Sequence, residues 1–163
     1  LTAYSQLPLL VALPETTAQV ADILQVCAAF GAKVVPRGAG TSLSGGALPL
    51  ADGVLLGMAK FNRILEIDYE NRCVVAQPGV TNLAVTQAVQ RRRFCYAPDP
   101  SSQSACTIGG NVATNSGGPH TLKNGVTTNH VLGYEMVLPD GTVERLGIEP
   151  DAAPGRRTLM QAG

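Results

Sequence analysis

Apolar and polar positions over the first part of the chain predict a strand, a helix and a second strand. The apolar run at residues 9–13 is typical of a strand. Thr16, with Gln19 three residues later, is the pattern of a helix capping box. Apolar side chains then recur at helical spacing, at Val20, Ile23, Leu24 and Cys27. We expect this helix to end at Gly31 and a short strand to cover residues 33–36, an order that resembles a small βαβ unit.

The rest of the chain predicts further strands and one more helix. Short apolar runs predict strands over residues 54–58, 64–68, 73–76, 131–138 and 142–146. Thr81 is a typical N-cap for a helix that ends near the three arginines at residues 91–93. The Pro-Asp-Gly run at residues 139–141 is a hairpin signal between the last two strands. This mixture predicts an α+β domain of two lobes, about residues 1–58 and 59–163, with a mostly antiparallel later half.

Two glycine-rich segments, which we expect to be loops, stand out against this pattern. The first glycine segment covers residues 35–42 and reads V-P-R-G-A-G-T-S, and the second glycine segment covers residues 107–118 and reads T-I-G-G-N-V-A-T-N-S-G-G. Glycine clusters at the ends of strands and helices indicate either tight turns or main-chain N–H groups that contact a phosphate. Two such segments favour a long ligand that carries a diphosphate, and a pair of structural turns is the alternative.

Two well-known phosphate-binding patterns do not fit these segments. A Walker loop needs Lys followed by Ser or Thr after its last glycine, and neither segment has that pair. The Rossmann fingerprint needs glycine at positions one, three and six, and Gly38 and Gly40 fit the first two, but the sixth position is Leu43. The sequence therefore disfavours both kinds of site.

Composition narrows the class of protein further. Twelve basic residues balance twelve acidic residues among the 163, so we expect no nucleic-acid-binding surface. No apolar run is long enough to cross a bilayer, which predicts a soluble protein, and the length of the chain predicts one domain. The four cysteines lack metal-ligand spacing, so we expect the reduced thiols of a cytoplasmic protein and no metal. The start at Leu1, without an initiator Met or a secretory signal, indicates a piece of a longer protein.

Several motifs, in order along the chain, together resemble one family. They are the first glycine segment with L-S-G-G-A after it, A-P-D-P-S-S-Q at residues 97–103, the second glycine segment, H-V-L-G at residues 130–133 and P-D-G at residues 139–141. On these motifs the chain is similar to the FAD-linked oxidases of the vanillyl-alcohol oxidase type, which have a PCMH-type FAD-binding domain. Within that family it resembles the FAD-binding D-subunits of bacterial glycolate oxidases and their D-lactate dehydrogenase relatives.

The resemblance implies that FAD lies between two α+β lobes and contacts both glycine segments. Residues 36–42 would wrap the pyrophosphate, with main-chain N–H groups donating to phosphate oxygens. Residues 98–99 and 107–110 would line the second side, and residues 114–117 would border the ribityl chain and the flavin ring. The residues implied to bind FAD are Pro36, Arg37, Gly38, Ala39, Gly40, Thr41, Ser42, Gly45, Pro98, Asp99, Thr107, Ile108, Gly109, Gly110, Ala113, Thr114, Asn115, Ser116, Gly117 and Val131.

Departures from the family pattern refine these expectations. Thr41 stands where members with covalent flavin have His, and Cys106 is one position away from the cysteine of doubly linked members, so we expect non-covalent FAD. Asn124 replaces a Tyr that is usual in the closest relatives. The chain stops at Gly163, before a further cofactor-contacting stretch and the cap domain that carries the family's substrate and catalytic residues.

The resemblance implies an enzyme that oxidises a small 2-hydroxy acid, of the glycolate or D-lactate type, by hydride transfer to flavin N5. Electrons would leave through an iron–sulfur partner subunit or a quinone, and partner subunits would hold the protein at the inner membrane. The alternative is a non-catalytic FAD-binding or nucleotide-binding assembly subunit of the same complex, like its second flavin-fold subunit.

Four polar residues have candidate roles that follow from their own chemistry. His120, His130 and Asp99 are each a candidate general base. A hydrogen bond to a loop carbonyl is the plainer role for the two histidines. For Asp99, which precedes Pro100 as turn residues often precede proline, a structural role in the cofactor site is the plainer one. Arg37 is a candidate phosphate partner by its charge, with a solvent-facing role as the alternative.

Overall fold

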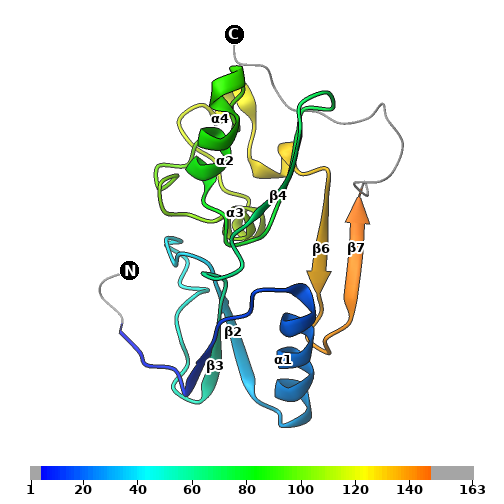
Figure 1. The fold of residues 1–163 in the computed structure, drawn as a ribbon. Helices are drawn as coiled ribbons and strands as arrows, with labels where there is room; N and C mark the ends of the chain where they lie inside the picture. The colour runs from blue at the N-terminus through cyan, green and yellow to red at the C-terminus, as the bar shows by residue number, and fades with distance from the viewer. Residues whose placement is uncertain (1–4, 148–163) are drawn as a thin grey trace.

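The computed structural model describes residues 5–147 as an α+β fold (Figure 1), which confirms the predicted fold class. Its strands are β1 (Leu10–Ala12), β2 (Lys33–Arg37), β3 (Gly53–Gly57), β4 (Ile64–Asp68), β5 (Cys73–Ala76), β6 (Gly133–Val137) and β7 (Val143–Gly147). Its α-helices are α1 (Thr17–Ala29), α2 (Asn82–Val89), α3 (Ile108–Thr114) and α4 (Thr121–Asn124), and its 3-10 turns are η1 (Gln90–Arg92) and η2 (Thr127–His130). Figure 1 shows β2, β3 and α1 in the lower half and α2, α3 and α4 in the upper half.

A parallel sheet with the strand order β1-β3-β2 forms the N-terminal part of the molecule. β3 lies in the middle and pairs in parallel with both neighbours. This central place suits its nearly continuous apolar sequence, and Val54 and Leu56 are only 5% and 3% exposed. Val20 of α1 packs in one buried cluster with Leu56 and Phe61. The first glycine segment begins at the carboxyl end of β2, so this sheet sets the position of that loop.

The ends of α1 follow local sequence signals. Thr16 Oγ1 accepts a hydrogen bond from the N–H of Gln19 at 3.2 Å. Gln19 Oε1 accepts from the N–H of Glu15 at 2.7 Å, whereas a standard capping box would use the N–H of Thr16. Gly31 follows the helix with a φ of +61°, a left-handed conformation that glycine adopts without steric cost. The predicted start and end of this helix are confirmed.

β6 and β7 form the predicted antiparallel hairpin, and β4 and β5, which were predicted as strands, form a second one. In the β6–β7 turn, Gly141 has a φ of +85° and its N–H donates to the carbonyl of Leu138 at 2.8 Å. β6 also reaches the N-terminal part, because Glu135 Oε1 accepts a hydrogen bond from the Thr17 hydroxyl of α1 at 2.5 Å. Val137 packs against the buried cluster of the parallel sheet. The division into two lobes near residue 58 stays a prediction.

Part of the second glycine segment is helical, so the prediction of a loop over residues 107–118 is wrong for residues 108–114, which form α3. Glycine disfavours a helix interior by about 1 kcal/mol per residue, which is why the sequence indicated a loop. Thr107 overcomes this as an N-cap, because its Oγ1 accepts from the N–H of Gly110 at 3.3 Å. Asn115 ends the helix with a left-handed φ of 48°. Similarly, the strand predicted from residue 131 begins at Gly133, because η2 occupies residues 127–130.

Two further observations concern the residues that the structure describes. None of the helices between residues 5 and 147 is long and apolar enough to span a membrane. Within residues 5–147 no disulfide joins any of the four cysteines, and Cys106 is 4% exposed, as expected of a packing residue.

Candidate functional site

The first glycine segment leaves β2 as an irregular loop with unused donors. Gly40 and Gly45 have φ values of +70° and +77°, which residues with a side chain rarely adopt. Within residues 5–147, the backbone N–H groups of residues 38–43 donate no hydrogen bond to another residue. Adjacent N–H groups without an internal acceptor are the donors that phosphate groups bind. The loop therefore offers a row of hydrogen-bond donors to an anionic ligand.

Arg37 supports this loop from the inside. Its Nη1 donates a hydrogen bond to the carbonyl of Ala47 at 2.9 Å, across the loop. A Cβ at Gly40 would collide with the Arg37 guanidinium group. Gly40 therefore leaves room for this side chain in addition to allowing the positive φ. A direct contact between Arg37 and phosphate stays a prediction, while the bond to Ala47 gives the side chain a structural role.

The two glycine segments meet at Gly38 and Thr107. A Cβ at Gly38 would overlap the Thr107 hydroxyl, so the two residues are in direct contact. Thr107 is 8% exposed and also forms an isolated antiparallel bridge with Thr81, at the start of α2. The fold thus brings residues 38–42 and 107–110 together from distant parts of the sequence.

The amides at the start of α3 already have acceptors inside the protein. The N–H groups of Ile108 and Gly109 donate to the carbonyls of Val80 and Pro78 at 2.8 and 2.9 Å, and the third amide is taken by the Thr107 cap. A Cβ at Gly109 would lie 2.6 Å from Cβ of Pro78, so the packing of the protein itself requires this glycine. The start of α3 therefore forms a fixed wall, because its amides at residues 108–110 are already bonded within the protein.

The end of α3 places the remaining residues of the second segment near η2. Residues 113–115 and Gly117 are exposed, and Ser116 is half-buried. Asn115 Oδ1 accepts hydrogen bonds from the N–H of Thr128, at 3.0 Å, and from the Thr128 hydroxyl. The carbonyl of Ser116 accepts from the hydroxyl of the buried Thr127 at 2.7 Å. These bonds join the end of α3 to η2, and Val131 directly follows η2 in the sequence.

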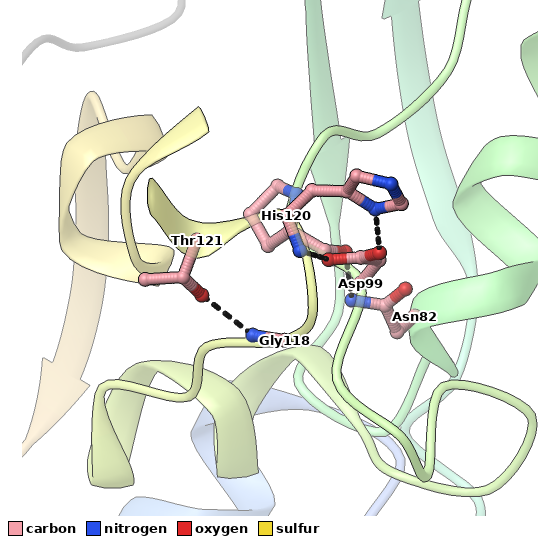
Figure 2. Close-up of polar contacts among 6 residues, drawn as sticks. Asn82, Asp99, Gly118, His120 and Thr121 are labelled. Atoms are coloured by element: carbon pink, nitrogen blue, oxygen red, sulfur yellow. Dashed lines mark hydrogen bonds and ion pairs between the residues drawn. The ribbon is translucent and has the colours of Figure 1, made fainter. Parts of the chain in front are cut away.

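Asp99 pairs with His120 between the loop before α3 and the start of α4 (Figure 2). Asp99 Oδ2 lies 2.5 Å from His120 Nδ1, and Asp99 Oδ1 accepts from the backbone N–H of His120 at 3.4 Å. The hydrogen bond from His120 holds the pKa of Asp99 below its usual range. The His120 side chain is 68% exposed, against 23% for Asp99. Two of the predicted candidate residues thus form one pair.

Asn82 is a residue of this region that sequence reasoning did not single out. Its side chain is fully buried, and its Nδ2 donates to the carbonyl of Pro98 at 3.0 Å. Pro98 is itself fully buried, so its side chain is closed to a ligand and its carbonyl anchors the loop before Asp99. Asn82 Oδ1 and Nδ2 of the buried Asn111 have no hydrogen-bond partner within residues 5–147. The sequence signal for Asn82 was a polar residue at the first position of a predicted helix. The hydrogen bond from its side chain to Pro98 is seen only in the fold.

His130 has the plainer of its two predicted roles. One ring nitrogen, Nε2, lies 2.7 Å from the carbonyl of Asn124. The His130 ring also lies edge-on to the ring of Tyr96, with centroids 6.3 Å apart. Burial, with a smaller effect of Cys106, raises the pKa of Tyr96 to about 12, so this phenol stays neutral at neutral pH. These contacts fix the segment before Val131.

A cavity of about 280 Å³ lies beside the first glycine segment. It is lined by Ser5, Gln6, Arg37, Gly40, Ser42, Gly45, Ala47, Leu48, Pro49 and Leu55. These residues all belong to the N-terminal part of the chain, and none comes from the second glycine segment. The cavity therefore extends the inner side of the first loop, next to the free N–H groups.

Comparison with known proteins shows what such a site holds. A family described as an FAD binding domain matches residues 8–147. The chain is 54% identical over 155 residues to the glycolate oxidase subunit GlcD of Escherichia coli strain K12, covering 95% of this chain and 31% of that protein. It is 44% identical over 144 residues to GlcD of Bacillus subtilis strain 168, covering 88% and 31%. It is 38% identical over 134 residues to a D-lactate dehydrogenase of Archaeoglobus fulgidus, covering 82% and 30%.

The match therefore spans 31% or less of the length of these three curated relatives. A solved structure of alkyldihydroxyacetonephosphate synthase shares the fold, with a TM-score of 0.75 at 23% identity, over 88% of this chain and 26% of that one. The free N–H groups of the first loop and the contact between the two glycine segments fit a cofactor that carries a diphosphate. These findings confirm the resemblance seen in the sequence: the chain belongs to the FAD-linked oxidase family through its FAD-binding domain, and its cofactor is FAD.

Proposed function

We propose that this FAD-binding domain serves the oxidation of a small 2-hydroxy acid of the glycolate or D-lactate type. The observation that carries the proposal is the 54% identity, over 95% of the chain, to a glycolate oxidase subunit. Other relatives are named D-lactate dehydrogenase and D-2-hydroxyglutarate dehydrogenase, at 39% and 40% identity. The acids in all these names carry a hydroxyl on the carbon next to the carboxylate, which supports one class of substrate.

In this proposal the first glycine segment holds the diphosphate of FAD. The N–H groups of residues 38–43 would donate to its oxygens, with the Arg37 charge behind the loop. The start of α3 would form the opposite wall, and residues 113–117 with Val131 would border the flavin end. FAD would be bound non-covalently, because the hydroxyl of Thr41 is a poor nucleophile and Cys106 is buried.

The chemistry is divided between the cofactor and the protein. Bound FAD supplies an acceptor for the hydride on the carbon that bears the substrate hydroxyl. The residues of this chain orient the cofactor and stabilise its negative charge with fixed main-chain dipoles. The relatives have more than two thirds of their length outside the match, and we propose that groups of that part bind the acid and take its hydroxyl proton.

An anaerobic titration of the complete natural polypeptide with glycolate and with D-lactate tests this function. The flavin absorption in the visible range is expected to bleach with at least one of them. Propionate, which lacks the hydroxyl, is the matched control and should leave the flavin oxidised. A flavin that stays oxidised with every 2-hydroxy acid contradicts the proposal.

The same titration tests the second candidate, a non-catalytic FAD-binding subunit of an oxidase complex. The E. coli relative is named as a subunit, so that protein belongs to a complex in which another subunit can carry the chemistry. Bound FAD that no 2-hydroxy acid reduces, even when the complex is purified with its partner subunits, is the result that this candidate predicts. An iron–sulfur protein among those partners would support the proposed route for the electrons.

A further inference from the structure

We propose that Asp99 and His120 form a clasp that positions the FAD site, with His120 as the residue that closes it. The clasp joins the loop at residues 98–100 to the segment at residues 117–121 (Figure 2). Asp99 is among the residues that the family resemblance implies to bind FAD, and Gly117 lies in the stretch proposed above to border the flavin end, so the inference rests on those contacts. A pair that ties two such segments together fixes the width of the site between them.

The clasp has more contacts than an isolated ion pair on the surface. Both carboxylate oxygens of Asp99 are used by His120, one by the ring at 2.5 Å and the other by the backbone N–H at 3.4 Å. A Cβ at Gly118 would overlap the Asp99 carbonyl, so the two backbones are in direct contact. The N–H of Gly118 in turn donates to Thr121 Oγ1 at 2.7 Å. His120 is therefore held by its neighbours on both sides.

One half of the clasp is anchored in the core, and the other half is exposed. The fully buried Asn82 fixes the carbonyl of Pro98, directly before Asp99, by a hydrogen bond of 3.0 Å. The segment with His120 leads into α4, a helix of only four residues, in which Leu122 is fully exposed. The 98–100 loop is thus the fixed side, and the segment with His120 is the side whose position depends on the pair. Loss of the pair is expected to widen the site more than to unfold the protein.

A double-mutant cycle on FAD affinity tests the clasp in the complete natural polypeptide. Asp99→Asn, His120→Gln and the double variant are prepared as apoproteins and titrated with FAD by calorimetry. Each single variant is expected to bind FAD about fivefold more weakly, which corresponds to the loss of one hydrogen bond. The double variant should bind no more weakly than either single one, because both changes break one interaction. His120→Arg, which keeps a cation that can bond the carboxylate, should restore the affinity.

The control pair is Lys33 and Asp52, an ion pair of 2.7 Å at the opposite end of β2 from the first loop. Lys33→Gln and Asp52→Asn should leave FAD affinity and the visible circular dichroism of the flavin unchanged, whereas the Asp99 and His120 variants should alter both. Unchanged FAD affinity in Asp99→Asn and His120→Gln, additive losses in the double variant, or a loss that merely follows the melting temperature of the apoprotein would overturn the proposal. If wild-type protein binds FAD but its flavin is not bleached by 2-hydroxy acids, the proposed substrate class is wrong. The clasp is tested separately, by the FAD affinities of the double-mutant cycle.

Discussion

At the scale of single residues, the glycines of this chain have two different roles. Gly40 has a φ of +70° in the loop whose amides are free, so it serves the shape of the proposed phosphate site. Gly109 packs against Pro78, so it serves the interior of the protein. The sequence pattern alone presents both as members of glycine-rich segments. The atoms that a Cβ would meet at each position distinguish the two roles, Arg37 at Gly40 and Pro78 at Gly109. The two roles predict different effects of substitution.

Gly40→Ala should weaken FAD binding with little effect on the rest of the fold. An alanine at this φ costs about 1 kcal/mol, and its Cβ would displace the Arg37 guanidinium, so FAD should bind about fivefold more weakly. Gly46→Ala in the same loop is the matched control, because a Cβ there has no atom within 4 Å. Fluorescence titration of the apoproteins with FAD measures the difference. Equal affinities for the two variants would show that the loop shape is not important.

Gly109→Ala should destabilise the protein itself. Its Cβ would lie 2.6 Å from Pro78, and overpacking of this kind typically costs about 1–3 kcal/mol. Gly110→Ala is the control, because its Cβ would meet only the Thr107 hydroxyl, at 3.2 Å. Urea unfolding of the two apoproteins should give a clearly lower free energy of unfolding for Gly109→Ala. If both variants unfold alike, Gly109 does not have the packing role assigned to it.

At the scale of elements, α3 and β6 show how distant segments hold the site together. The first amides of α3 bond the carbonyls of Pro78 and Val80, which fixes the second glycine segment on the start of α2. β6 bonds α1 through Glu135 and Thr17, which ties the C-terminal hairpin to the parallel sheet. Each link joins residues that are far apart in sequence. The wall of the site is therefore a product of tertiary contacts.

The link between α1 and β6 predicts a pH dependence of stability. The Thr17 hydroxyl and then Arg145 hold the pKa of Glu135 below its ordinary value of 4.5. A lowered carboxyl pKa stabilises the folded state above that ordinary value, and this contribution is lost as the pH falls through the lowered pKa. Glu135→Gln should remove it, so the variant should lose less stability than wild type between pH 5 and pH 3, roughly 0.5 kcal/mol, since 32% of the side chain is exposed.

Urea unfolding as a function of pH measures this difference. Glu144→Gln on β7 is the control, because the Glu144 carboxylate makes no hydrogen bond or ion pair within residues 5–147. It should keep the acid-dependent loss of wild type. A Glu135→Gln variant with the full acid-dependent loss would contradict the role given to this link.

At the scale of the whole molecule, the sequence predicted what local chemistry determines and missed what long-range contacts determine. The Thr16 cap, the Gly31 stop and the turn at Gly141 are local signals, and the structure confirms them. The helix α3 was missed, because its glycines are stabilised by acceptors that lie outside their own segment. The pairing of Asp99 with His120 was likewise hidden, although each residue was a candidate by itself.

The candidate site also has features that the local sequence predicts and features that depend on long-range contacts. The sequence pointed to both glycine segments, and the fold brings them into contact at Gly38 and Thr107. It did not show that the amides at residues 108–110 are already bonded, since two of their acceptors are the carbonyls of Pro78 and Val80. We therefore propose that the diphosphate of FAD binds the N–H groups of residues 38–43, and that the start of α3, whose amides at residues 108–110 are already bonded, forms the opposite wall.

Hydrogen exchange of the backbone amides, with and without FAD, tests this claim most directly. In the apoprotein, the amides of residues 38–43 should exchange rapidly, because they have no acceptor within the described chain, and those of residues 108–110 should be protected. Addition of FAD should slow the exchange of residues 38–43 strongly and change residues 108–110 little. Protection that appears at residues 108–110 while residues 38–43 keep exchanging rapidly would contradict the account.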